Sequence, residues 1–223
     1  MRFVLEALRS RREKRLENEA NEWIRRTRIE STERLFAQKV DVLKIAFGPT
    51  PDPSIEAQRP DRLDSLYLGA IGLDASVQAY AADMDALPDF MGLLRTGRSE
   101  AAPGYLIGQH ADNSRLHTYF AIEPWFGGKR VHVLSNDNDL FARLKAAHVR
   151  PPPPWVAFPD FQPPSVLLQG DQQFWFENVW DPYFQPLTRE ERAAYLATHD
   201  APAEWVEDLS DRAMRPTNDP EPD

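Results

Sequence analysis

Residues 151–188 form an aromatic block that constrains the fold more than any other part of the chain. The block has no Lys or Arg, and its charged side chains are Asp160, Asp171, Glu177 and Asp181. It holds nine of the chain's 24 aromatic side chains, namely Trp155, Phe158, Phe161, Phe174, Trp175, Phe176, Trp180, Tyr183 and Phe184. Because an aromatic side chain buries a large area when it packs, the block predicts a core against which the other elements are built.

The alternative is that part of the block stays at the surface as a docking face. Such a face would be apolar and negatively charged, because the block has no cation to balance its carboxylates. The residues predicted to bind a partner are Trp175, Trp180, Asp181 and Tyr183. Desolvated Trp and Tyr side chains anchor protein interfaces and acidic side chains steer basic partners, so this alternative predicts a basic protein partner.

Length and composition predict one globular domain with a sizeable core. The chain has 223 residues, of which 42% are hydrophobic, and no Cys, which excludes disulfides and thiolate metal sites. We expect a helical segment at 1–47, a single domain at 48–214 and a disordered tail at 215–223. No apolar run is long enough to cross a membrane and the N-terminus is too charged for a signal peptide, so a soluble, cytoplasmic protein is expected.

The first 47 residues contain neither Gly nor Pro, and Gly48-Pro49 then supplies a helix stop. This pattern predicts one long helix, or two nearly continuous helices with a break near Ser31-Thr32. Apolar residues at helical spacing are sparse in the middle of the segment and dense at its end, at Phe36, Val40, Leu43 and Phe47. Only the last turns are therefore expected to pack in the core, and the earlier turns can form a projecting arm.

The N-terminal segment differs in charge from the rest of the chain. Residues 1–39 carry 11 basic and 7 acidic side chains (+4), which leaves 15 basic and 28 acidic (−13) for the rest and −9 in total. A basic helix can dock on nucleic acid or on a membrane surface, and this is a third possible function. The acidic remainder opposes nucleic-acid binding. The apolar stripe of the helix can instead pair with a second copy, which predicts a homo-oligomer.

The middle of the chain contains a clear hairpin signal. Leu116–Ile122 and Arg130–Leu134 are predicted strands that turn at Gly127-Gly128, and Tyr105–Gln109 is a candidate third strand. The polar run Ser135–Asp139 is expected to begin a helix, because caps and carboxylates favour the positive end of the helix dipole.

A second hairpin is predicted inside the aromatic block. It joins Val166–Gln169 to Gln172–Phe176 through Gly170-Asp171, a pair suited to a type II′ turn. Residues 63–94 have apolar spacing typical of short core helices, and residues 95–104 are predicted to form a polar loop.

Helices are predicted to close the fold at its C-terminal end. Thr188 and Glu191 form a capping box, and Pro202 suits the first turn of a further helix in which Val206 and Leu209 pack inward. The predicted fold class is therefore α+β: a long N-terminal helix and other helices on an antiparallel sheet of two hairpins.

No catalytic, metal-binding or phosphate-binding motif occurs in the sequence, so no cofactor or metal is predicted. The five His residues are scattered, without an HExxH or His-x-His pattern. His110 and His117 would converge if the loop between them folds back. Asp137 and Asp139 follow a strand, where sites often form. A hydrolase that uses these four residues is the alternative function, because acid–base catalysis needs only two groups in the right geometry.

The predicted function is that of a non-catalytic binding protein whose acidic, aromatic surface neutralises or adapts a protein partner. An antitoxin-like or immunity-type inhibitor is the sharpest form of this prediction, because an acidic surface with aromatic anchors suits a basic partner.

Overall fold

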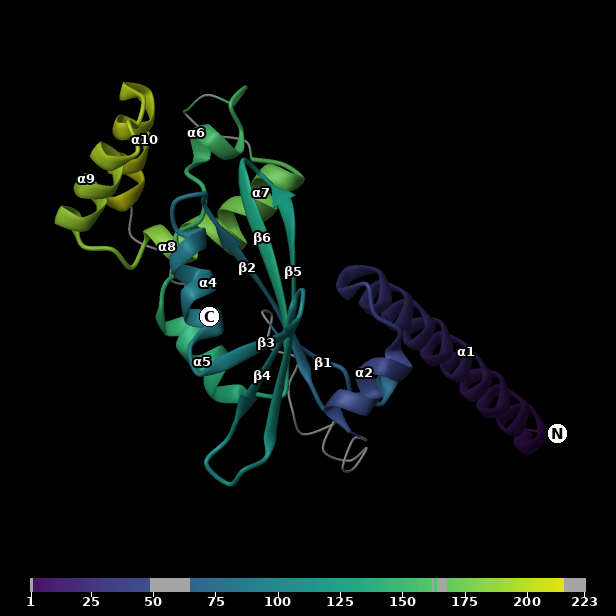
Figure 1. Cartoon of the computed structure of the whole chain (residues 1–223). Coiled ribbons are helices and arrows are strands. Elements are labelled where there is room, and N and C mark those ends of the chain that lie inside the picture. Colours follow the sequence, from purple (N-terminus) through teal and green to yellow (C-terminus); the bar gives the residue numbers. More distant parts are fainter. Residues whose placement is uncertain (1, 49–64, 162, 164–167, 215–223) are drawn as a thin grey trace. The chain divides into compact units, whose positions relative to one another are not determined.

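The protein has an α+β fold, which confirms the predicted class. The structure, a computed structural model, describes residues 2–48, 65–161, 163 and 168–214 (Figure 1). The predicted tail at 215–223 and the first two residues of Val166–Gln169 lie outside these residues. Six strands form one antiparallel sheet in the order β1-β2-β6-β5-β4-β3. The strands are β1 (Ser65–Tyr67), β2 (Ser76–Ala82), β3 (Arg98–Ala102), β4 (Tyr105–Gln109), β5 (Arg115–Trp125) and β6 (Gly128–Ser135).

The helices lie before, between and after these strands. The first half of the chain has α1 (Arg2–Phe36), α2 (Val40–Phe47), the 3₁₀ turn η1 (Gly69–Ile71) and α4 (Leu87–Arg95). The second half has α5 (Asn138–Ala146), α6 (Pro154–Ala157), α7 (Asp171–Trp175), the π-helical turn η2 (Phe176–Trp180), α8 (Asp181–Phe184), α9 (Arg189–Thr198) and α10 (Ala203–Met214).

The chain divides into two compact units, each assembled from three segments. Unit 1 comprises Met1–Ala79, Gly97–Ala121 and His132–Asn138. Unit 2 comprises Tyr80–Thr96, Ile122–Val131 and Asp139–Asp223.

The core of unit 1 is built around the end of α1 and around α2. Phe36, Leu43 and Phe47 are buried in one cluster, as their dense apolar spacing predicted. The helix breaks at residues 37–39, because Ala37 adopts a positive φ of 50°, and not near Ser31-Thr32. Glu33 stabilises this break, since its carboxylate accepts the Val40 backbone N–H at 3.0 Å and satisfies an amide at the start of α2.

Three local predictions are wrong for identifiable reasons. Val77, Tyr80 and Ala81 have helical spacing, but they lie in β2, a short run that periodicity alone cannot distinguish from a helix. The predicted loop at 95–104 contains β3, an edge strand that is mostly exposed and therefore polar. Gln172–Phe176 is helical and not a strand, which removes the second predicted hairpin.

The hairpin formed by β5 and β6 is confirmed, but its turn lies at Phe126 and Gly127. Both residues have positive φ, 41° and 73°, as a two-residue type I′ turn requires. Gly128 begins β6 instead, where a Cβ would lie 2.5 Å from the Ala82 carbonyl oxygen. Glycine at 128 is therefore required by close packing and not by the turn.

The aromatic block supplies much of one core cluster of unit 2. Its fully buried members include Trp175, Phe176 and Trp180, which pack with Phe184. Tyr195 and Trp205, from α9 and α10, complete this cluster. The burial of these rings confirms that the block forms a core.

Candidate functional site

The candidate site is a groove between α9 and α10 in unit 2, and it begins at the predicted capping box. The Thr188 side-chain oxygen accepts the Glu191 backbone N–H at 3.2 Å, and the Glu191 carboxylate accepts the Thr188 backbone N–H at 2.7 Å. The hydrogen bond from the Thr188 backbone lowers the pKa of Glu191. The start of α9 is therefore fixed by local sequence, as predicted.

The turn after α9 sets the position of α10. Asp200 has a positive φ of 47°, its N–H donates to Ala197, and the next N–H, of Ala201, donates to Leu196 at 3.0 Å. This is the Schellman arrangement, which satisfies carbonyl groups that the helix end leaves free. Pro202 then precedes α10 and accepts N–H donation from its first turn. The chain reverses direction, and the two helices lie side by side.

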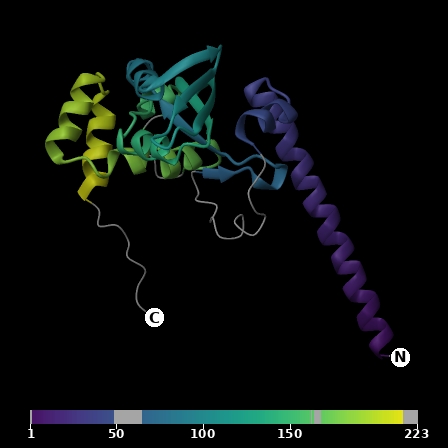
Figure 2. The ribbon, with the colours of Figure 1, turned by 60° about the horizontal axis from the view of Figure 1, so that its bottom comes forward.

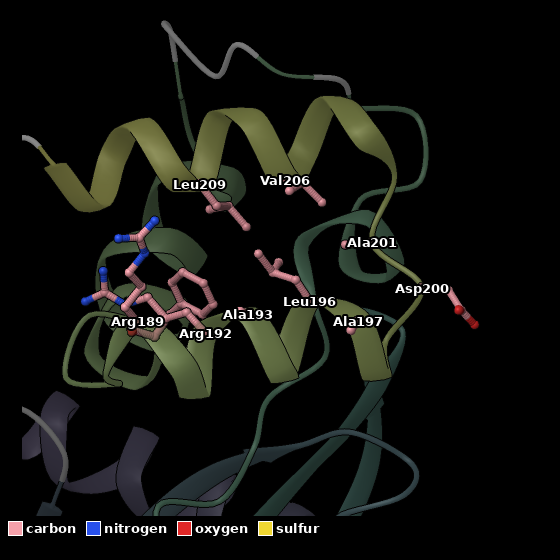
Figure 3. A pocket seen from close by; sticks show the side chains of 10 residues that line it. Arg189, Arg192, Ala193, Leu196, Ala197, Asp200, Ala201, Val206 and Leu209 are labelled. Atoms are coloured by element: carbon pink, nitrogen blue, oxygen red, sulfur yellow. Dashed lines mark hydrogen bonds between the residues drawn. The ribbon is translucent and has the colours of Figure 1, made fainter.

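A groove of about 770 Å³ lies between these helices, a volume typical of ligand sites (Figure 3). Leu209 and Val206 of α10 point toward Leu196 of α9. The described residues that line the groove are Phe184, Arg189, Arg192, Ala193, Leu196, Ala197, Asp200, Ala201, Val206 and Leu209. Val206 was predicted to pack inward, but 39% of it is exposed. The groove therefore presents apolar surface that neither helix covers.

The charged groups of the groove lie near its ends, and the two arginines have different surroundings. Arg192 donates from Nε to the Phe184 carbonyl at 3.2 Å and from Nη2 to the Gln185 carbonyl, and its guanidinium lies 5.6 Å from the Phe184 ring centroid. Arg189 is exposed, and within the described residues it has no hydrogen-bond or ion-pair partner. Asp200 lies at the opposite end and points away from the groove (Figure 3). Of the two arginines that line the groove in the described part of the chain, Arg189 is therefore the one available to a ligand.

The four residues predicted to bind a partner occupy two environments. Trp175 and Trp180 are fully buried, at 0% exposure, and their rings stack with centroids 5.7 Å apart. Asp181 and Tyr183 are half-buried. In this conformation the two tryptophans have no surface to offer a partner, so their burial favours the core interpretation of these two residues.

The four residues of the hydrolase alternative lie in four different environments, and the two histidines differ in exposure. His110 is exposed, with Nδ1 3.3 Å from an Asp112 carboxylate oxygen. His117 is buried, and its Nδ1 lies 2.6 Å from the Tyr105 hydroxyl, while burial lowers its pKa. These contacts give His117 a structural partner on the neighbouring strand.

The two carboxylates of that alternative lie at the start of α5. Asp137 is buried, receives a hydrogen bond from Arg98 and has its backbone N–H bonded to the Ser135 hydroxyl at 3.1 Å. Asp139 is exposed in the first turn of α5, where a carboxylate favours the helix dipole. Ser135–Asp139 thus begins a helix, as predicted. An ion pair and a helix end account for both carboxylates without a catalytic role.

Sequence reasoning missed a polar cluster in unit 2 that forms over long sequence separations. Asp83 binds Arg150, and the Tyr195 and His199 rings pack with centroids 4.4 Å apart. Burial lowers the pKa of His199 and raises that of Tyr195. No sequence motif joins these residues, because the fold alone brings them together. Among the residues with described structure, no three His, Asp or Glu side chains are grouped to hold a metal ion.

Comparisons with known proteins assign this chain to no family. No protein-family model matches the sequence, and neither the curated proteins nor the solved structures include one that is significantly similar. The described part of the chain contains no helix that is both long and apolar enough to cross a membrane.

Proposed function

We propose that the protein is a non-catalytic binding protein that holds an apolar segment of a protein partner in the groove between α9 and α10. The observation that carries this proposal is the exposure of Val206 inside a groove whose other aliphatic walls, Leu196 and Leu209, are buried. An exposed apolar wall in a concave site gains free energy when a partner covers it.

The shape and chemistry of the groove suit a helix or a short apolar peptide. Two antiparallel helices with aliphatic side chains between them are a common receptor for an apolar helix face. Arg189 stands at one end, exposed and without a partner among the described residues, so a carboxylate on the bound segment would face it. The expected segment therefore carries two or three aliphatic or aromatic anchors and one acidic group.

The charge of the rest of the hairpin supports a partner that is basic outside its bound segment. Residues 189–209 contain six acidic and two basic side chains, which gives −4 for this part of the chain. Acidic surface raises the association rate of a basic protein and has less effect on final affinity. An antitoxin-like or immunity-type inhibitor is the sharpest form of the proposal, and it is supported by this charge and by the net charge of −9.

A comparative affinity purification tests the proposal. Tagged wild-type protein, Val206→Glu and Val156→Glu are used to capture proteins from the native cell, and mass spectrometry compares what each retains. Val156 is a matched control, since 44% of it is exposed in the same unit but outside the groove lining. We expect a protein retained by the wild type and by Val156→Glu to be lost with Val206→Glu.

The purified partner then allows a direct measurement. Titration should show binding weakened at least about tenfold by Val206→Glu, since a buried charge without a partner is strongly unfavourable. Equal retention by all three proteins would exclude the groove as the binding site. Association that does not slow with added salt would exclude the basic partner.

A further inference from the structure

The middle of α1 exposes large apolar side chains. Every residue from Lys14 to Thr27 is exposed, including Trp23 at 68% and Leu16 at 55%. Figure 2 shows α1 as one unbroken helix. Among the side chains of α1 that the structure describes, those that pack against the core cluster of unit 1 lie in its last turns, from Ile29 to Phe36. Isolated helices are marginal in water, so an exposed helix of this length gains stability when a partner covers it.

We call residues 14–27 the arm. Four of its residues form a narrow seam along one face of α1. Leu16, Ala20, Trp23 and Thr27 are separated by four, three and four positions, which is the spacing of the core positions in a coiled coil. The seam alternates large and small side chains. A helix that covers it must therefore place a small residue opposite Trp23.

We infer that this seam pairs with the same seam of a second copy in an antiparallel arrangement. When the two helices cross between residues 21 and 22, Trp23 lies opposite Ala20 of the second copy and Leu16 lies opposite Thr27. Each large side chain then meets a small one, as close packing requires. The twofold symmetry repeats every contact, so both arms are covered and the assembly closes as a dimer.

The charges of the arm are complementary in this register. Glu17 and Glu19 precede the crossing point, and Arg25, Arg26 and Arg28 follow it. An antiparallel pair places the acidic group of one arm beside the basic group of the other, with Glu19 near Arg26. A parallel pair in register would place like charges together. Glu19 already accepts a 2.8 Å hydrogen bond from Arg15 Nε, which holds its carboxylate on the helix surface.

This interaction surface is separate from the groove between α9 and α10 and does not depend on the proposed function. We identify the partner as a second copy because the arm itself carries the small side chains that fit opposite its large ones and the basic side chains that fit beside its acidic ones. The contact spans two heptads, so a dimer that dissociates on dilution is expected.

Sedimentation equilibrium of the full chain over a range of concentrations tests the pairing. We expect a reversible dimer whose dissociation constant rises at least about tenfold with Trp23→Glu, because the seam then carries a charge. Ile45→Glu is the control, since Ile45 is 85% exposed on α2 of the same unit and should leave dimerisation unchanged. A wild-type chain that stays monomeric at every concentration would overturn the inference.

Charge-reversal variants distinguish pairing in this register from nonspecific association of exposed apolar helices. Glu19→Arg and Arg26→Glu should each weaken the dimer, and the double variant should restore it, because both symmetric contacts are rebuilt with opposite polarity. A double variant as weak as either single variant would exclude the register. Circular dichroism of each variant shows whether α1 keeps its helix content.

The absence of Cys allows a test of orientation. A single Cys at Ala20 lies on the seam, and in this register its two copies are three positions apart, which is about 4.5 Å along the helix axis, so it should cross-link with a short thiol reagent. A single Cys at Leu16, also on the seam, should not, because in this register the two copies of residue 16 are 11 positions apart, which is about 16 Å along the helix axis. Cross-linking at both positions would indicate a parallel pair and contradict the inference.

Discussion

Asp83 and Arg150 are 67 positions apart in the sequence and bind one another through both backbone and side chains. The Asp83 backbone N–H donates to the Arg150 carbonyl at 2.9 Å, and the Arg150 guanidinium donates to the Asp83 carboxylate. The same carboxylate accepts the Ala86 backbone N–H at 2.6 Å. One buried side chain therefore joins the end of β2, the start of α4 and the segment after α5.

Replacing Asp83 should destabilise unit 2. Asp83→Asn removes the charge that Arg150 requires, and because the carboxylate is 9% exposed and the guanidinium 27%, little water can replace it. We expect the free energy of unfolding to fall by about 2–4 kcal/mol. Denaturant unfolding measures this change. Asp85→Asn, at an exposed position two residues later, should change it by less than about 0.5 kcal/mol, and equal effects of the two variants would contradict the pairing.

The capping box of α9 is a smaller and more local source of stability. Thr188→Ala removes the acceptor of the Glu191 backbone N–H and should cost about 1 kcal/mol. Thr198→Ala, at the other end of the same helix, removes only a hydroxyl that donates to the Ala194 carbonyl and should have little effect. Thermal unfolding of the two variants compares these positions. A Thr188→Ala melt identical to that of the wild type would show that the box does not hold the helix.

The stability of the protein should fall when the pH drops below about 6.5, the pKa of an unperturbed histidine. Burial lowers the pKa of both His117 and His199, so the folded state keeps them neutral where the unfolded state already binds protons. The contribution is therefore constant above that pH and is lost as the pH falls toward the two lowered values. Denaturant midpoints measured from pH 8 to pH 5 test this slope. Replacing both residues by Gln should flatten it, and an unchanged slope would assign the effect to other groups.

The parts of the fold that could be predicted from the sequence depend on residues that are close together along the chain. The box of Thr188 and Glu191 and the start of α5 after Ser135 are set within five positions, so local chemistry suffices. The spacing of Leu43 and Phe47 likewise requires only a helix with one buried face. Such features can be predicted from sequence because the interacting residues lie in the same short segment as the structure that they determine.

The remaining features depend on contacts that the sequence does not display. β2 is a strand because it pairs with β1 and lies beside β6, although Val77 and Tyr80 have helical spacing. Ala37 adopts positive φ without being Gly, so the break after α1 has no local marker. The groove was missed for a related reason: Val206 fits a helix pattern, and only the placement of α9 shows that its side chain stays partly exposed.

The predicted docking role of Trp180 can be separated from its role in the core. Its ring is fully buried, stacks on Phe184 at 4.9 Å and meets the edge of Tyr195 at 5.5 Å. Trp180→Ala should therefore lower the free energy of unfolding by about 3–5 kcal/mol, because it leaves a large cavity among these rings. Phe174→Ala serves as the control, since Phe174 is 50% exposed and should cost much less. A docking anchor would behave in the opposite way: Trp180→Ala would leave the melting temperature nearly unchanged and weaken binding of the partner by about 2 kcal/mol or more.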